Sequence, residues 1–244
     1  MDRPIGHSAN IVGARVKRGV FEPQTKSFEE LIARHRNHAH EQEQPVQNRN
    51  RNLLQQVNET SDGQWPFAVV LSCIDSRTSA ELIFDQGLGD IFSVRVAGNI
   101  AGPMVLGSVE YACVVAGAKL VLVLGHTRCG AVTSTVELRS TGADPDQVAG
   151  CENLGHIVRA IDQAIAKEAL RPLVEMATAE REAFVDDVAK RNVLNVVESL
   201  SIKSEALRRL SDKHRISIVA GMYNVVDREI EFLDAASRVD ASES

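Results

Sequence analysis

The chain has 244 residues, of which 44% are hydrophobic, and a formal net charge of −6. This length and composition suit one large soluble α/β domain rather than two. The acidic pI near 5.7 disfavours a nucleic-acid partner, and the apolar stretches are too short for a membrane span. Charged residues interrupt the first apolar segment, so we see no signal peptide. With only four cysteines, we expect a cytoplasmic protein in a reducing compartment.

The N-terminal part is predicted to form an arm outside the core. We expect residues 1–26 to be an extended or flexible segment. A capping box from Ser27 to Glu30 opens an amphipathic helix. A polar stretch rich in Asn and Gln, from Glu41 to Asn52, follows it. We therefore assign residues 27–57 to a helical arm.

Strands and helices alternate between residues 67 and 124, which predicts a mostly parallel sheet. Phe67–Leu71, Ile91–Val96 and Leu120–Leu124 are predicted strands. Their nearly continuous apolar character indicates burial on both faces. A capping box at Thr78–Glu81 is predicted to start the first intervening helix, and Gly107–Ala118 forms the second.

The C-terminal half is predicted to add helices and a hairpin. Glu152–Ala169 and Glu180–Leu210 show helical periodicity with charged outer faces. Ile216–Tyr223 and Glu229–Leu233 are predicted to pair as a terminal hairpin. Nothing marks a second domain or an internal repeat. The predicted fold is therefore a single α/β domain over residues 1–244: a mostly parallel central sheet flanked by helices, with an N-terminal helical arm and a C-terminal hairpin.

Two clusters of reactive side chains each follow a predicted strand directly. The segment 73–77 reads Cys-Ile-Asp-Ser-Arg, and the segment 126–129 reads His-Thr-Arg-Cys. The carboxyl ends of parallel strands meet at one edge of a sheet, so both segments should project into one crevice. Two thiolates and one imidazole are a zinc-like ligand set, and three protein ligands plus a water are the catalytic pattern.

Each cluster also has a plainer interpretation when it is taken alone. A cysteine is often a small core residue, and a histidine after a strand often bonds only the backbone. Asp75 and Arg77 could likewise form a simple ion pair. At equivalent positions after two strands, however, the clusters together indicate metal chemistry. Asp75 is then either a fourth ligand or an acceptor beside a bound water.

These motifs resemble the zinc signature of the β-class carbonic anhydrases, which is Cys-x-Asp-x-Arg followed by His-x-x-Cys. The resemblance is strongest from Gln64 to Leu138. It extends to Glu81–Asp90, Val94–Asn99 and Gly107–Ala112, and more loosely to Asn192–Glu198. So many matches in register make the resemblance specific.

The resemblance implies a set of roles for the two clusters. Cys73, His126 and Cys129 would bind one zinc ion per chain. Asp75 and Arg77 would form the catalytic dyad that orients a zinc-bound hydroxide for attack on carbon dioxide. In a closed state Asp75 would itself take the fourth zinc position, and the pairing with Arg77 would prevent this.

Further residues follow from the same resemblance. Phe92, Ala97, Tyr111 and the backbone amide of Gly130 would line the site for carbon dioxide or bicarbonate. The missing side chain of Gly130 would let the backbone approach the metal closely. Phe92 and Tyr111 would also suit the core of almost any α/β domain. Gln64 would orient the substrate across a subunit interface, in a homodimer or homotetramer.

One position departs from part of that family. Some members carry a tryptophan three residues before the first zinc cysteine, where it helps to form a noncatalytic bicarbonate site. Here this residue is Val70, although Arg95 matches the arginine of that site. The sequence therefore favours an open zinc site with a water ligand.

Two alternative functions remain open at this point. The same scaffold could hydrolyse carbonyl sulfide or carbon disulfide, because discrimination would depend on an access channel. The chain could also be a non-enzymatic zinc-binding regulator in which Asp75 closes the metal permanently. The presence of Arg77 and Gln64 disfavours the regulator.

Overall fold

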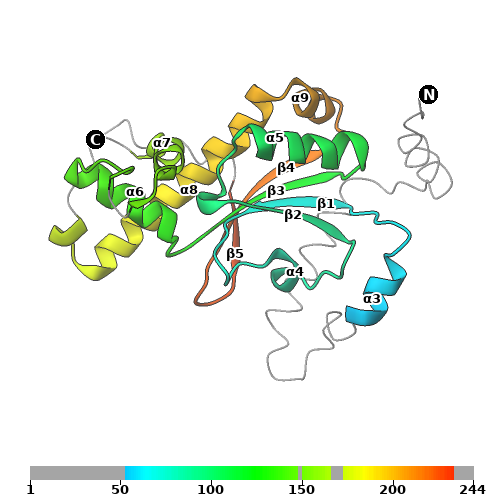
Figure 1. The fold of residues 1–244 in the computed structure, drawn as a ribbon, viewed down its shortest axis with the longest axis horizontal. Coiled ribbons are helices and arrows are strands. Elements are labelled where there is room, and N and C mark those ends of the chain that lie inside the picture. The colour runs from blue at the N-terminus through cyan, green and yellow to red at the C-terminus, as the bar shows by residue number, and fades with distance from the viewer. Residues whose placement is uncertain (1–52, 148–149, 166–172, 234–244) are drawn as a thin grey trace.

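A computed structural model of the chain describes residues 53–147, 150–165 and 173–233. Its centre is a five-stranded sheet with the strand order β2-β1-β3-β4-β5 (Figure 1). The first three pairings are parallel and the last is antiparallel. The predicted fold class, including the C-terminal hairpin, is confirmed. The strands are β1 (Ala68–Ser72), β2 (Ile91–Arg95), β3 (Leu120–His126), β4 (Ser217–Tyr223) and β5 (Ile230–Leu233).

Helices flank both faces of this sheet. In Figure 1, α5, α8 and α9 lie on one side of the sheet and α4 lies on the other, while α6 and α7 lie toward one end. The α-helices are α3 (Leu53–Glu59), α4 (Ala80–Ile83), α5 (Pro103–Glu110), α6 (Gly130–Thr141), α7 (Leu154–Asp162), α8 (Thr178–Lys203) and α9 (Glu205–Asp212). Shorter helical segments are the 3-10 helices η2 (Ala97–Asn99) and η6 (Leu173–Glu175) and the π-helix η3 (Tyr111–Val115).

The core has two parts, because successive residues of a strand point to opposite faces of the sheet. Val69 and Val121 pack in the larger cluster, together with residues of α5 to α9. Val70 and Leu122 pack on the other face with Phe84. Every residue of β1 and β3 is buried, as predicted.

The prediction of two-sided burial is wrong for β2. Only Ile91 of this strand is buried, while Ser93 and Arg95 are exposed. The reason is its place at the edge of the sheet, where it pairs with β1 alone.

The predicted capping box at Thr78–Glu81 is also wrong. The helix begins at Ala80, and its N-cap, Ser79, makes no capping hydrogen bond. The Thr78 hydroxyl instead donates to the carbonyl oxygen of Asp75 at 2.9 Å. The hydroxyl that was expected to cap the helix therefore closes the preceding turn.

Two other helices differ from their predicted bounds. The helix expected at 107–118 begins at Pro103, a residue that favours the first helical turn, and continues as a π-helix to Val115. The helix expected at 180–210 is divided at Ser204, whose extended backbone ends α8. The Ser204 hydroxyl then accepts a hydrogen bond from the Leu207 amide and caps α9.

The remaining predicted elements are described only in part. The helix expected at 152–169 extends from Leu154 to Asp162, and residues 166–172 lie outside the described residues. The predicted segment 1–26 and most of the arm also lie outside them. In the described part of the arm, α3 continues to Glu59, two residues beyond the predicted end.

Helix α8 packs very closely on β3. A Cβ atom added to Gly125 would lie 2.5 Å from Cγ2 of Val193 and 2.7 Å from Sδ of Met222. Only a glycine allows this approach, because packed interiors leave no room for an added methyl group. The middle of α8 is thereby held beside the carboxyl end of β3. Within the described ranges, no helix has the length and apolar character needed to cross a membrane.

Candidate metal centre

Three potential metal ligands meet at the carboxyl ends of β1 and β3. Cys73 directly follows β1, His126 is the last residue of β3, and Cys129 is the N-cap residue of α6. All three side chains are buried, and their ligand atoms lie within 4.8 Å of one another. The sequence placed His126 just after the strand, whereas the strand includes it.

The geometry of this cluster fits a tetrahedral zinc ion. The two sulfur atoms are 4.0 Å apart, and two Zn–S bonds of about 2.3 Å at a tetrahedral angle would separate them by about 3.8 Å. The Nδ1 atom of His126 donates to the Thr127 carbonyl oxygen at 2.9 Å. Its Nε2 atom is buried without a hydrogen-bond partner among the described residues. A metal ion would satisfy this nitrogen.

The protonation of the Cys73 thiol and that of the Cys129 thiol depend on each other. The neighbouring Cys129 thiol lowers the pKa of Cys73 to about 4, against the opposing effect of burial. His126 and the backbone amides of Asp75 and Gly98 also favour the Cys73 thiolate. The same contact, together with burial, raises the pKa of Cys129. The contact therefore favours a thiolate on one of the two sulfurs, and a metal that binds both sulfurs would displace the proton of the other.

Asp75 and Arg77 form a bidentate pair beside the cluster. Nε of Arg77 donates to Oδ1 of Asp75 at 2.9 Å, and Nη2 donates to Oδ2 at 2.7 Å. This pairing holds the pKa of Asp75 well below its usual range. The Asp75 oxygens do not join the ligand cluster in the described structure. The carboxylate is therefore ionised and directed toward the guanidinium.

Arg95 holds the same turn from the side of β2. Its Nε donates to the Cys73 carbonyl oxygen at 3.0 Å, and its Nη2 donates to the Asp75 carbonyl oxygen at 2.5 Å. The sequence related Arg95 to an anion site, but in this chain its guanidinium binds two backbone carbonyls. Arg95 thus positions the turn that carries one metal ligand and the carboxylate.

The turn between the other two ligands is held by α8. The backbone amide of Arg128 donates to Oδ1 of Asp186 at 2.8 Å, and the Arg128 guanidinium pairs with Glu182 at 3.1 Å. Arg128 has a φ of 55°, which costs a residue other than glycine about 1–2 kcal/mol. Burial raises the pKa of Asp186. The hydrogen bond to Asp186 and the ion pair with Glu182 offset the strain of the turn. The sequence analysis did not identify Asp186.

A second contact from α8 reaches the other side of the cluster. The buried Asn192 donates through Nδ2 to the Gly98 carbonyl oxygen at 2.8 Å. Gly98 has a φ of 66°, and its backbone amide helps to lower the pKa of Cys73. Helix α8 therefore supports both ligand-bearing segments. The only signal in the sequence was the family-like segment that begins at Asn192.

Two of the predicted substrate residues lie near the cluster. Ala97 begins η2, which packs against β1, β3 and α6. Gly130 follows the ligand Cys129 and is the first residue of α6. A Cβ atom on Gly130 would meet nothing within 4 Å outside its own helix and chain neighbours. The described chain therefore gives no steric reason for glycine at this position.

The other two predicted wall residues lie away from the cluster of their own chain. Phe92 and Tyr111 line a groove of about 530 Å³ between β2 and α5, together with Met104. Phe92 is paired with Val69, four positions before Cys73, which is about 13 Å along an extended strand. Within one chain these aromatic side chains do not join the metal cluster.

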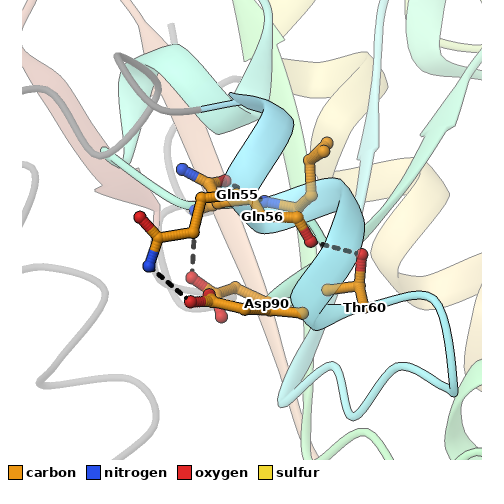
Figure 2. A pocket seen from close by; sticks show the side chains of 7 residues that line it. Gln55, Gln56, Thr60 and Asp90 are labelled. Atoms are coloured by element: carbon orange, nitrogen blue, oxygen red, sulfur yellow. Dashed lines mark hydrogen bonds between the residues drawn. The ribbon is translucent and has the colours of Figure 1, made fainter.

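Gln64 lies near the opposite end of β1 from Cys73. It is exposed, and its Cβ lies 3.7 Å from where a Cβ on Gly89 would be. The loop that contains Gly89 is bound to α3, because the Leu88 amide donates to Oε1 of Gln56 at 2.9 Å. A polar pocket lies between α3 and this loop and is drawn in Figure 2. In it, the Thr60 hydroxyl donates to the backbone carbonyl oxygen of Gln56. The length of β1, about 17 Å, separates Gln64 from its own metal cluster.

Comparisons of the sequence agree with this geometry. A sequence model of the carbonic anhydrase family matches residues 68–230. Carbonic anhydrase 2 of Mycobacterium tuberculosis is 37% identical over 165 residues, which cover 68% of this chain and 73% of that protein. A carbonic anhydrase of Mycolicibacterium smegmatis is 35% identical over 171 residues, covering 70% and 76%.

Solved structures with low sequence identity share the fold. The β-carbonic anhydrase CcaA has a TM-score of 0.61 at 20% identity, covering 86% of this chain and 97% of that chain. A chain from the crystal structures of two tetrameric β-carbonic anhydrases of Sordaria macrospora matches with a TM-score of 0.59 at 19% identity, covering 86% of this chain and 94% of that chain. At such identities these likenesses speak for the fold alone.

We predict one zinc ion per chain, held by the Cys-His-Cys cluster. Cys73→Ser and Cys129→Ser should each lose most of the zinc, because a serine hydroxyl stays protonated near neutral pH and is a poor zinc ligand. Elemental analysis after dialysis against a chelator measures this. Cys151→Ser is the matched control, because Cys151 is exposed, forms no disulfide and lies outside the cluster.

Normal zinc retention in either cluster variant would contradict the ligand assignment. A second zinc ion that survives dialysis in the unchanged protein would contradict the stoichiometry.

Proposed function

Because this chain belongs to the carbonic anhydrase family, we propose that it catalyses the reversible hydration of carbon dioxide to bicarbonate and a proton. It is an enzyme of the β class, and zinc is its metal. The observation that carries the proposal is the bidentate Asp75–Arg77 pair beside the Cys-His-Cys cluster. Among the described residues the cluster offers three ligands, which is the number of protein ligands that catalytic zinc sites use.

The residues around the cluster have different roles in such a reaction. When bound, zinc lowers the pKa of a coordinated water, to about 7 in carbonic anhydrases with histidine ligands, so that hydroxide is available near neutral pH. Asp75 accepts the hydrogen bond of the attacking oxygen and so directs a lone pair toward the substrate carbon. Arg77 retains its charge at all working pH values and keeps Asp75 ionised and away from the metal.

Asp75 can act only as an acceptor in this role. Its pKa lies well below the usual range because Arg77 donates two hydrogen bonds to it. Because the pKa of Asp75 is lowered in the folded protein, its carboxylate stays charged at neutral pH and at mildly acidic pH. A loss of activity at mildly acidic pH would therefore arise from another group.

The substrate site is proposed to form between two copies of the chain. Carbon dioxide is small and uncharged, so its site needs apolar walls. Phe92 and Tyr111 lie in an exposed groove, and Gln64 lies at the far end of β1 from its own cluster. A second copy that covers this groove would bring these residues to a neighbouring zinc site. Solved relatives include tetrameric β-carbonic anhydrases, which supports a homodimer or a homotetramer.

A cytoplasmic location is also part of the proposal. None of the four cysteines forms a disulfide, and two of them lie in the metal cluster. Such thiols persist more readily in a reducing compartment.

Stopped-flow measurement of carbon dioxide hydration on the zinc-loaded protein tests the reaction. Carbonyl sulfide and carbon disulfide hydrolysis are measured on the same preparation, because those linear substrates could use the same site. We expect hydration to have the highest kcat/KM. If carbonyl sulfide or carbon disulfide is hydrolysed with a higher kcat/KM, the proposed reaction is wrong and the protein is a hydrolase of that substrate. If the protein binds zinc but shows none of the three activities, it is a zinc-binding regulator rather than an enzyme.

The dyad makes its own prediction. Arg77→Ala should keep zinc but free Asp75 to take the fourth metal position, whereas Asp75→Ala should keep zinc with an open position. Loss of one such charge-assisted contact costs about 2–4 kcal/mol of transition-state stabilisation, or roughly 30- to 1000-fold in rate. Stopped-flow kinetics and zinc X-ray absorption measure the two effects. Arg139→Ala is the control, because Arg139 is similarly exposed and pairs with Asp162.

If Arg77→Ala shows no carboxylate oxygen from Asp75 on zinc, the gating role of Arg77 is wrong. An equal loss in Arg139→Ala would mean that the rate responds to surface charge in general.

The shared site predicts complementation between two inactive variants. Gln64→Ala keeps its zinc site, and Asp75→Ala keeps its glutamine. In a mixed dimer, the intact zinc site of the first chain meets the intact Gln64 of the second, so one of the two sites is restored. Hydration activity should therefore rise after the two variants are dissociated and mixed.

No gain on mixing, with mixed dimers shown by mass spectrometry, would place Gln64 in the site of its own chain or outside the reaction. A monomer that is fully active at assay concentration would also contradict the shared site.

A further inference from the structure

One peptide unit links His126 to a carboxylate on α8. The Thr127 carbonyl oxygen accepts the hydrogen bond of His126 Nδ1 at 2.9 Å. The amide of the same peptide unit, which is the N–H of Arg128, donates to Oδ1 of Asp186 at 2.8 Å. The carboxylate, the peptide and the imidazole therefore form a continuous chain of hydrogen bonds. The other ring nitrogen of His126, Nε2, is buried without a hydrogen-bond partner among the described residues, so it is the one left to bind a metal.

The local backbone is shaped for this connection. Arg128 adopts a left-handed conformation with a φ of 55°, and its amide is thereby directed to α8. The Arg128 side chain pairs with Glu182, one helical turn before Asp186. On the other side, the Thr127 hydroxyl accepts a hydrogen bond from the Val225 amide at 3.1 Å. The peptide is thus held from both sides.

A carboxylate at one end of a peptide changes the hydrogen bond at the other end. An ionised acceptor polarises the N–H group, and the linked carbonyl oxygen becomes a stronger acceptor, because hydrogen bonds that follow one another in a chain polarise each other. A stronger acceptor at Nδ1 fixes the tautomer with a free Nε2 lone pair and raises the basicity of that nitrogen. In many metal sites a carboxylate contacts the histidine directly, whereas here a peptide lies between them.

We propose that Asp186 is a positioning residue for the zinc ligand His126, and that it acts through the Thr127–Arg128 peptide. Asp186 does not touch the metal or the substrate. Its carboxylate orients the imidazole and strengthens the His126–zinc bond. The inference rests on zinc binding at the Cys-His-Cys cluster and does not require that carbon dioxide is the substrate.

Three variants separate the parts of this effect. Asp186→Asn keeps an oxygen acceptor for the Arg128 amide but removes the charge. Asp186→Leu removes both the acceptor and the charge. Glu182→Gln is the matched control, because it removes one negative charge from the same face of α8, keeps an oxygen acceptor for the Arg128 guanidinium and does not touch the peptide.

The first measurement is the zinc dissociation constant, determined by competition with a chelator. Loss of an outer-shell partner of a metal ligand typically costs 10- to 100-fold in affinity. We expect this loss in Asp186→Leu and a smaller loss, roughly threefold to tenfold, in Asp186→Asn. Glu182→Gln should stay within about twofold of the unchanged protein.

The second measurement reads the hydrogen bonds themselves. Nitrogen NMR of the zinc-loaded protein reports the Nδ1–H group of His126, and hydrogen exchange reports the Arg128 amide. Both should change in the order Asp186→Leu, Asp186→Asn, Glu182→Gln. A merely structural role would lower stability without moving the His126 signal in a zinc-loaded, folded protein.

Unchanged zinc affinity in Asp186→Leu would overturn the inference. An equal loss in Glu182→Gln would also overturn it, because the effect would then come from charge alone. A loss of affinity with an unmoved His126 signal would assign Asp186 to the general stability of the turn. Failure of the hydration assay would leave these zinc measurements unaffected, so the two proposals fail separately.

Discussion

The parallel pairing of β1 with β3 is the constraint on which the other features of the site depend. Ser72 is paired with Leu124, so Cys73, which directly follows β1, and His126, which ends β3, lie at the same edge of the sheet. This places two sulfurs and a ring nitrogen in the core, and a buried nitrogen without a partner costs about 1–3 kcal/mol. A metal ion offsets that cost, so zinc binding contributes directly to the stability of the fold.

The same sheet separates the metal cluster from the residues that we propose to bind the substrate. The metal cluster lies at the carboxyl ends of the strands, whereas Gln64 precedes β1 and Phe92 lies early in the edge strand β2. A strand is a rigid spacer, so no side-chain rotation brings these groups together in one molecule. The exposed aromatic groove beside α5 and the distant glutamine are more easily understood as parts of a site that a second copy completes.

The ligands and the dyad were predictable because their relations are local. Cys73 directly follows a buried strand and His126 ends another, and Asp75 lies two residues from Arg77, so a short turn suffices to pair them. Asp186 was not predictable, because helical periodicity does not say which carboxylate faces a turn 58 residues earlier. The division of the long helix at Ser204 was missed for a similar reason: the serine hydroxyl caps α9 and also donates to the distant Glu110.

Helix α8 connects two of the segments that surround the metal cluster. Asp186 binds the turn that follows β3, and Asn192, six residues later and about 9 Å along the helix, binds the segment that follows β2. Both contacts depend on the height of α8 above the sheet, which the missing side chain of Gly125 permits. A shift of this helix would therefore displace the partners of His126 and of Cys73 together. Two strands bring the metal ligands together, but a helix that contributes no ligand holds the segments around those ligands in position.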